Sequence, residues 1–189
     1  MEIAPDLNNK KRLLNYSSII HYMSKITLYI ATSSDGFIAT KEGSVAWLDK
    51  FSELGEDYGY NEFIKPIDIV IMGNTTYEQV LGFGEYPYKG KKGYVFANKV
   101  GKDENVTFVN GNVKEFIEKV SGNIWLIGGA NIAQQFHKYN LIDKYIIFVM
   151  PVELKEGIKL FEDNYKENLI LEKKKEFPSG VIEYHYKKN

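Results

Sequence analysis

Short apolar runs alternate with helix-like patterns from Lys25 onward. The apolar runs are residues 26–32, 67–72, 94–97, 106–109, 124–127 and 145–150. The second, fifth and sixth of them are apolar at nearly every position, which is typical of strands covered on both faces. The alternation predicts βαβ units and a mainly parallel sheet, with those three strands at its centre.

Three helices follow from the spacing of apolar positions between these runs. The first has apolar residues at i, i+3, i+4 and i+7 within 113–120 and takes Asn112 as its N-cap. The second covers the apolar positions of 132–136. The third starts near Thr75, which can form a capping box with Glu78.

The two ends of the chain differ from this pattern. Residues 1–24 are polar and basic with scattered apolar positions, so we expect a loosely ordered N-terminal extension before a single domain at 25–189. Near the C-terminus, the runs 169–177 and 181–186 flank a Pro-Ser-Gly turn and predict an antiparallel hairpin. The expected fold is therefore α/β, with a mostly parallel central sheet, flanking helices and an antiparallel C-terminal hairpin.

Composition excludes several function classes. The 189 residues carry 24 basic and 25 acidic side chains, so the broad positive field of a nucleic-acid-binding protein is absent. Without cysteine there are no disulfides, thiolate nucleophiles or cysteine-ligated zinc of the nucleobase deaminase kind. No apolar run approaches ~18 residues, so we expect a cytoplasmic protein without a membrane span. The three histidines are scattered; His137 is expected at the surface, and no metal site is expected.

Two predicted strand-to-helix junctions carry chemical information. One buried strand ends at Gly73, and another ends at Gly128 and Gly129. Each junction places free backbone N–H groups at the carboxyl end of a strand, where glycine allows close approach and the helix dipole favours an anion. One such glycine often serves only backbone geometry, but two on one sheet favour a pyrophosphate site. Neither junction is a Rossmann fingerprint, and the chain has no P-loop.

Four segments in a fixed order carry a family resemblance. They are ITLYIATSSDGFIA at 26–39, MGNTTYE at 72–78, IGGA at 127–130 and PVELKEGIKLF at 151–161. Together they resemble the dihydrofolate reductase-like superfamily, and most closely the C-terminal reductase domain of the riboflavin-biosynthesis deaminase-reductase and its stand-alone relatives. The resemblance covers about residues 25–186.

This resemblance implies a site for NADPH across the strand ends, with NADH not excluded. Ala31 and Ile38 would border the nicotinamide. The phosphates would lie against Gly73, Asn74, Thr75, Thr76, Gly128, Gly129, Ala130, Asn131 and Ile132. Ala97, Asn98 and Lys99 would lie near the adenosine end. It also implies a cis peptide bond between Gly128 and Gly129, as in folate reductases.

The same resemblance implies a substrate site. Tyr29, Trp47 and Phe148 would form its apolar wall. Folate reductases place a buried carboxylate on the helix after the first loop, and here residues 47–57 offer four carboxylates. Asp49 is our choice for the group that hydrogen-bonds or protonates the substrate ring, and Glu53, one helical turn further on, is the reserve.

Several positions depart from the folate reductase pattern. The single arginine of the chain is Arg12, and Asn74 stands where family members usually carry arginine. A guanidinium donates two parallel hydrogen bonds to a phosphate or carboxylate, which lysine cannot do. Lys99 could instead meet a 2′-phosphate, and Lys89 or Lys91 a substrate carboxylate. Phe148 replaces a threonine that contacts the pterin.

The sequence thus predicts a reductase that transfers a hydride from NADPH to a C=N or C=O group of a small pyrimidinone or pterin-like heterocycle. Dihydrofolate reductase proper is one alternative, disfavoured by the missing arginine and threonine. A nucleotide-binding module of the same fold, without catalysis, is another. The resemblance also implies a symmetric homodimer.

Overall fold

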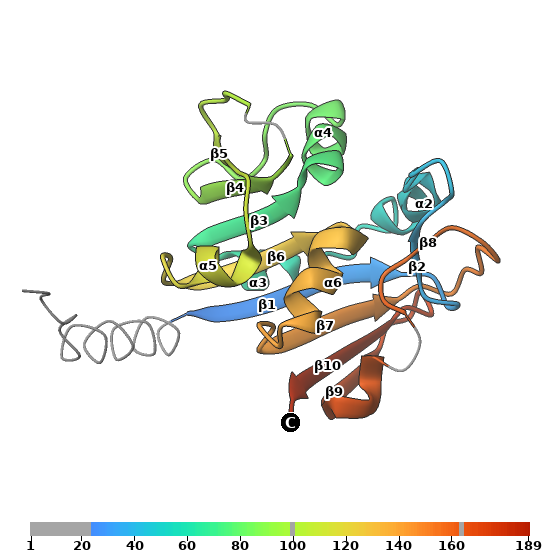
Figure 1. Cartoon of the computed structure of the whole chain (residues 1–189). Helices are drawn as coiled ribbons and strands as arrows, with labels where there is room; N and C mark the ends of the chain where they lie inside the picture. The colour runs from blue at the N-terminus through green and yellow to red at the C-terminus, as the bar shows by residue number, and fades with distance from the viewer. Residues whose placement is uncertain (1–23, 99–100, 163–164) are drawn as a thin grey trace, which may run out of the picture.

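The computed structural model describes residues 24–98, 101–162 and 165–189. The predicted N-terminal extension, apart from residue 24, and Lys99 lie outside these residues. In the described part the main sheet has eight strands in the order β5-β4-β3-β6-β1-β7-β10-β9 (Figure 1). Its strands are β1 (Lys25–Thr32), β3 (Ile69–Gly73), β4 (Lys92–Phe96), β5 (Val106–Val109), β6 (Asn123–Gly128), β7 (Lys144–Val149), β9 (Leu169–Glu176) and β10 (Ile182–Lys188). A small antiparallel sheet pairs β2 (Phe37–Ala39) with β8 (Ile158–Lys159).

The sheet has the predicted mixture of strand directions. Strands β5, β4, β3, β6, β1 and β7 are parallel, whereas β10 pairs antiparallel with both β7 and β9. The three nearly all-apolar runs form β3, β6 and β7, which lie with β1 in the middle of the sheet. Both the parallel centre and the C-terminal hairpin are confirmed.

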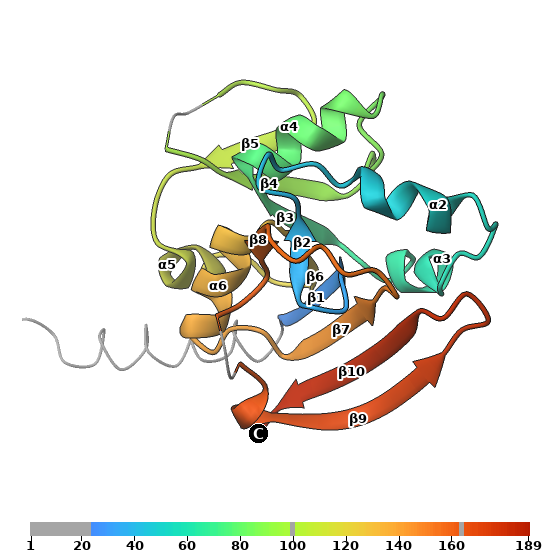
Figure 2. The ribbon, with the colours of Figure 1, turned by 90° about the vertical axis from the view of Figure 1, so that its right-hand side faces the viewer.

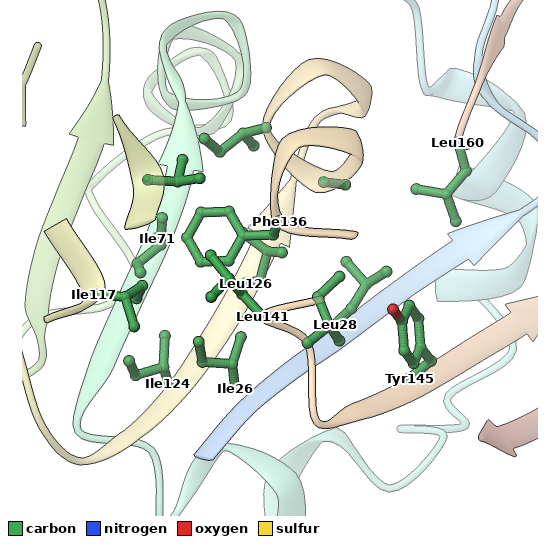
Figure 3. Close-up of a cluster of buried hydrophobic side chains, with 14 of the residues drawn as sticks. Ile26, Leu28, Ile71, Ile117, Ile124, Leu126, Phe136, Leu141, Tyr145 and Leu160 are labelled. Atoms are coloured by element: carbon green, nitrogen blue, oxygen red, sulfur yellow. The ribbon is translucent and has the colours of Figure 1, made fainter. Parts of the chain in front are cut away.

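The helices lie on the two faces of the sheet. They are α2 (Asp49–Ser52), α3 (Tyr60–Ile64), α4 (Asn74–Gly82), α5 (Val113–Ile117) and α6 (Ala130–Lys138), with the 3₁₀ turns η1 (Ala46–Leu48) and η2 (Tyr165–Asn168). Helices α5 and α6 cover one face, where Phe136 and Ile117 pack on Ile71 and Leu126 (Figure 3). Side chains from α3 and α4 pack on the opposite face around Trp125.

Two details of the predicted helices need correction. Helix α5 has the expected cap, since the Asn112 side chain accepts a hydrogen bond from the Lys114 N–H at 2.8 Å, but the helix ends at Ile117. The Thr75–Glu78 capping box is wrong. Strand β3 runs directly into α4 at Gly73, so Thr75 already lies inside the first turn, and Glu78 instead accepts from the Asn74 amide at 2.8 Å.

His137 is also not the surface residue that its polar neighbours predict. Its ring is half-buried on α6 and packs against the ring of Phe161, with 4.7 Å between centroids. Its Nδ1 lies 2.8 Å from the Tyr145 hydroxyl. The apolar stripe of α6 faces the sheet, so a residue at the edge of that stripe becomes partly covered.

The order of the strands places a switch point beside β6. After β3 the chain moves outward through β4 and β5, then returns to insert β6 between β3 and β1 and crosses to β7. In open α/β sheets the crevice at the carboxyl ends of the strands beside such a reversal is the usual ligand site. Both glycine junctions lie there, at the ends of the neighbouring strands β3 and β6.

Candidate functional site

The two strand-to-helix junctions are in direct contact. Met72 is the register partner of Gly128, after a shift in the pairing of β3 with β6. The Gly129 N–H donates a hydrogen bond to the Thr76 hydroxyl at 2.8 Å. The Gly128–Gly129 peptide bond is cis, which confirms the expectation from the family resemblance.

Helices α4 and α6 both begin without a side-chain cap, because glycine is the N-cap residue of each. The first N–H groups of a helix have no partner within it. The backbone N–H groups of residues 74–76 and 130–132 are therefore available to bind a ligand beside the contact between the two junctions. Such a pair of helix N-termini suits the phosphate groups of one ligand.

A cavity of about 1170 Å³ opens beside these helix starts. Fourteen of the predicted site residues line it: Tyr29, Ala31, Ile38, Gly73, Asn74, Thr75, Thr76, Ala97, Asn98, Gly129, Ala130, Asn131, Ile132 and Phe148. Gly128 is buried behind this lining, and a Cβ on it would meet Ile30 Cδ1 at 3.2 Å. We call the part lined by residues 73–76 and 129–132 the phosphate end.

The structure does not bring Asp49, Glu53 or Trp47 to this cavity. Phe51 is the buried residue of the short helix α2. Asp49 lies two positions before Phe51, and Glu53 lies two positions after it. Each is therefore rotated about 200° around the helix axis from Phe51, and both are exposed. Trp47 packs instead in an apolar cluster with Phe51, and its buried Nε1 has no hydrogen-bond partner among the described residues. The choice of Asp49 as the acid is therefore not supported by its position.

The carboxylates that do line the cavity are Glu56 and Asp57, from the loop between α2 and α3. The Asp57 carboxylate accepts hydrogen bonds from the N–H groups of Gly59 at 2.9 Å and Asn61 at 3.3 Å. These bonds, the Gly59 one foremost, lower the pKa of Asp57. Asp57 is thus a permanently charged acceptor near neutral pH, and a poor proton donor.

An aromatic cluster lines the other part of the cavity, which we call the substrate end: Tyr29, Tyr58, Tyr60, Trp125 and Phe148. The Tyr29 ring lies 4.8 Å from that of Phe148 and 6.0 Å from that of Trp125. The Trp125 indole N–H donates to the Tyr29 carbonyl at 3.1 Å, which fixes its orientation. Burial raises the pKa of Tyr29, so its phenol remains protonated.

The sequence did not predict Tyr58, Tyr60 or Trp125 as site residues, nor several polar residues of the lining. Asn110 and Gly111 line the cavity directly after β5, and the Asn110 amide donates to the Asn98 carbonyl at 3.1 Å. They could have been found, because Asn110 directly follows the parallel strand β5, as Asn74 directly follows β3. Tyr58 and Tyr60 had no such signal, since an irregular loop and a short helix bring them in.

Among the described residues that line the cavity, none is lysine, arginine or histidine. Lys89 forms an exposed ion pair with Glu85 at 2.7 Å. Lys91 donates to the Ile67 carbonyl at 2.8 Å, beside the amino end of β4. The suggestion that either lysine meets a substrate carboxylate is therefore wrong, because the site lies at the carboxyl ends of the strands.

The described residues offer neither a candidate metal site nor a candidate membrane-spanning helix. They contain no group of three or more His, Cys, Asp or Glu side chains arranged to hold a metal ion. In residues 24–98, 101–162 and 165–189, no helix has the length and apolar content needed to cross a bilayer.

Comparison with known proteins places this chain in a family. No protein-family model matches the chain. Two uncharacterized proteins of Bacillus subtilis (strain 168) are similar to it: YwjB is 41% identical over 170 residues, covering 86% of this chain and 97% of YwjB. YyaP is 31% identical over 182 residues, covering 86% of this chain and 95% of YyaP.

Solved structures are also similar to this chain. A protein of Shewanella sp. PV-4, provisionally named a riboflavin biosynthesis protein, matches with a TM-score of 0.76 and 27% identity, over 87% of this chain and 99% of that one. Dihydrofolate reductase of Enterococcus faecalis, complexed with NADP(H), matches in fold with a TM-score of 0.65 and 16% identity, over 87% and 96%. The protein has the dihydrofolate reductase-like fold. The chain belongs to the same family as YwjB and YyaP.

Proposed function

We propose that this protein is a reductase that uses a nicotinamide dinucleotide to reduce a C=N or C=O group of a small heterocycle. The observation that carries the proposal is the direct link between two uncapped helix N-termini, Thr76 to Gly129, at one end of a cavity whose other end is aromatic. A dinucleotide has a diphosphate and a flat redox-active ring, and the two ends of the cavity match these groups. The similarity to reductases supports the same class of reaction.

The chain offers specific groups for the cofactor. Backbone N–H groups of residues 74–76 and 130–132 would hold the diphosphate, and Ala31 and Ile38 would flank the nicotinamide ring. Asn98 also lines the cavity and is the candidate contact for the adenosine ribose. NADPH remains the expected form, with Lys99 as the cation for its 2′-phosphate. The bound dinucleotide would supply the hydride.

The protein's own contribution would be orientation and exclusion of water. Tyr29, Trp125 and Phe148 form apolar surfaces against which a planar ring can stack. Since Asp57 is held ionised, it can accept a hydrogen bond from a ring N–H but cannot readily supply a proton. Glu56 is the other carboxyl group of the cavity lining, and we assign it, in place of Asp49, as a candidate hydrogen-bond partner of the substrate ring.

The cofactor site can be tested by adding charge at the start of α6. Ala130 lines the cavity and is the first residue of this helix. Ala130→Glu places a carboxylate against the diphosphate, whereas Ala130→Gln has the same shape without the charge. We expect Ala130→Glu to weaken NADPH binding at least about tenfold relative to Ala130→Gln, which is about 1.4 kcal/mol. Titration followed by the fluorescence of the reduced nicotinamide measures both, and NADH is titrated alongside.

Oxidation of the bound cofactor tests catalysis separately. A pteridine and a pyrimidinone are each added to the protein with NADPH, and loss of the reduced nicotinamide absorbance is followed. Turnover would support the reductase. Binding of NADPH without oxidation by any heterocycle would favour a nucleotide-binding module, for which the lack of a buried carboxylate on the cavity lining is the structural argument. Equal NADPH binding by the two Ala130 variants would contradict the phosphate site.

Two remaining expectations concern folate as a substrate and the oligomeric state. Folate reduction is disfavoured because the family resemblance matches Phe148 to the pterin-contacting threonine, and because the described cavity lining has no cation for the glutamate tail. A homodimer stays a prediction, to be measured by light scattering during size-exclusion chromatography.

A further inference from the structure

The substrate end of the cavity is covered by one strongly acidic segment. Residues 46–64 comprise η1, α2, α3 and the loop between the two helices, which lie together at one side of the molecule (Figure 2). The segment carries five carboxylates against a single lysine, a net charge of −4, although the whole chain has a net charge of only −1. Glu56 and Asp57 of this segment lie on the cavity lining itself.

Among the described residues, no lysine, arginine or histidine lines the cavity beside this segment. Lys50 belongs to the segment and Lys175 attracts Asp57, but neither lysine lines the cavity. The Lys50 Nζ lies 4.9 Å from the centroid of the Phe51 ring, and the Lys175 Nζ lies 4.0 Å from that of Phe177. Lys175 contributes only a minor attraction to Asp57, whose charge is stabilised chiefly by backbone N–H groups.

The aromatic residues on the same cavity lining add to this preference. Tyr29, Tyr58 and Tyr60 line the substrate end beside Trp125 and Phe148. The faces of such rings attract positive charge and stack with flat heterocycles, but they offer nothing to an anion. The polar groups that could meet a substituent of the substrate are thus carboxylates and phenols, in surroundings of net negative charge.

We propose that the substrate of this protein is a flat heterocycle bearing amino or amidine hydrogen-bond donors, uncharged or cationic, and that the site rejects versions of the same ring with a phosphate or carboxylate tail. This rests on the proposed function, because it concerns the ring that would receive the hydride. It extends to all anionic tails what the missing arginine already implies for the carboxylate of folate. An anionic tail would lie beside Glu56 and Asp57 with no described lysine or arginine on the lining to pair with it.

The test compares ligands that share a ring and differ by one acidic group. Pterin is paired with pterin-6-carboxylate, and 2-aminopurine riboside with its 5′-monophosphate. The dissociation constant of each ligand is measured from its own fluorescence. We expect the member without the acidic group to bind at least about tenfold more tightly in each pair at low salt, with the ratio shrinking as salt is raised.

Matched variants assign the ratio to the proposed residues. The double variant Glu56→Gln with Asp57→Asn removes both carboxylates from the lining, and asparagine can still accept from the Gly59 N–H. The control, Glu53→Gln with Glu62→Gln, removes two charges from the same segment at positions that are exposed, as Glu56 and Asp57 are, but lie outside the lining. The ratio should fall toward one in the first variant and change less than twofold in the second.

Three results overturn the proposal: equal or tighter binding of the acidic members, an unchanged ratio in the Glu56 and Asp57 double variant, or no binding of any of the four ligands by protein that binds NADPH. None of these measurements requires turnover. Failure to bind NADPH, by contrast, overturns the proposed reductase while the comparison of ligand pairs remains readable.

Discussion

The hydroxyl of Thr76 accepts a hydrogen bond from the backbone N–H of Gly129 at 2.8 Å, across 53 residues of sequence. Thr76 lies in the first turn of α4, and Gly129 is the N-cap of α6. One side chain therefore ties together the starts of two helices that follow adjacent strands. Because the relative position of these helix starts is fixed, their free N–H groups are preorganised for a single anionic ligand.

Thr76→Val removes this link while keeping the shape of the side chain. The Gly129 N–H would lose its acceptor, and a partly buried donor without a partner costs about 1–3 kcal/mol. We expect the free energy of unfolding, from urea denaturation, to fall by that amount and NADPH binding to weaken. Thr107→Val, at an exposed position of β5, is the control and should leave both unchanged. Wild-type stability of Thr76→Val would show that the link is not needed.

Gly93 of β4 is required by packing and not by its backbone conformation. A Cβ at this position would lie 2.6 Å from the Tyr86 hydroxyl and 2.7 Å from Val106 Cγ1. We expect Gly93→Ala to lower the free energy of unfolding by about 1–3 kcal/mol, the usual cost of overpacking a buried site. Gly82→Ala is the matched control, since nothing lies within 4 Å of its added Cβ. An unaffected Gly93→Ala variant would mean that the neighbouring side chains yield easily.

Tyr86 has a buried hydroxyl that has no hydrogen-bond partner among the described residues. Burial raises the pKa of Tyr86 to about 12, so the hydroxyl stays protonated and polar in apolar surroundings. Tyr86→Phe should therefore leave the unfolding free energy unchanged or raise it slightly. Tyr145→Phe should instead lower it by about 1 kcal/mol, because the Tyr145 hydroxyl bonds to His137. A loss of stability in Tyr86→Phe as large as in Tyr145→Phe would contradict this account.

His137 should make stability depend on pH. Burial lowers its pKa below the ordinary value, and Tyr145, whose own pKa is raised by burial, remains the donor to Nδ1. The folded state thus favours the neutral imidazole. Its contribution to stability is complete above the unfolded pKa of about 6.5 and is lost as the pH falls through the lower folded value.

The measurement is urea unfolding of wild type and His137→Gln at pH values from about 7.5 to about 5. We expect the wild type to lose stability over this interval, and His137→Gln to lose less. His185→Gln serves as the control, because that ring pairs with Glu183 and not with a neutral hydroxyl. Parallel pH profiles for the wild type and His137→Gln would rule out this role of His137.

Much of the phosphate end could be predicted because it depends on local rules. A glycine that ends a buried parallel strand and opens a helix, as Gly73 does, exposes backbone N–H groups wherever the strand lies in the sheet. The same rule applied to β5 would have added Asn110. The substrate end could not be predicted in this way. Its carboxylates come from an irregular loop after a four-residue helix, so a choice between Asp49 and Asp57 had no periodicity to support it.

The sequence by itself determined the parallel sheet, its antiparallel C-terminal hairpin and the two glycine junctions, because apolar periodicity and backbone freedom act over a few neighbouring residues. Only the tertiary structure decided that Thr76 meets Gly129 and that Phe51 turns inward and Asp49 outward. It also decided that Glu56 and Asp57 share a cavity lining with an aromatic cluster and with no described cation. These contacts join segments far apart in the chain. Their geometry is set by how the strands are ordered in the sheet, which no short pattern of residues records.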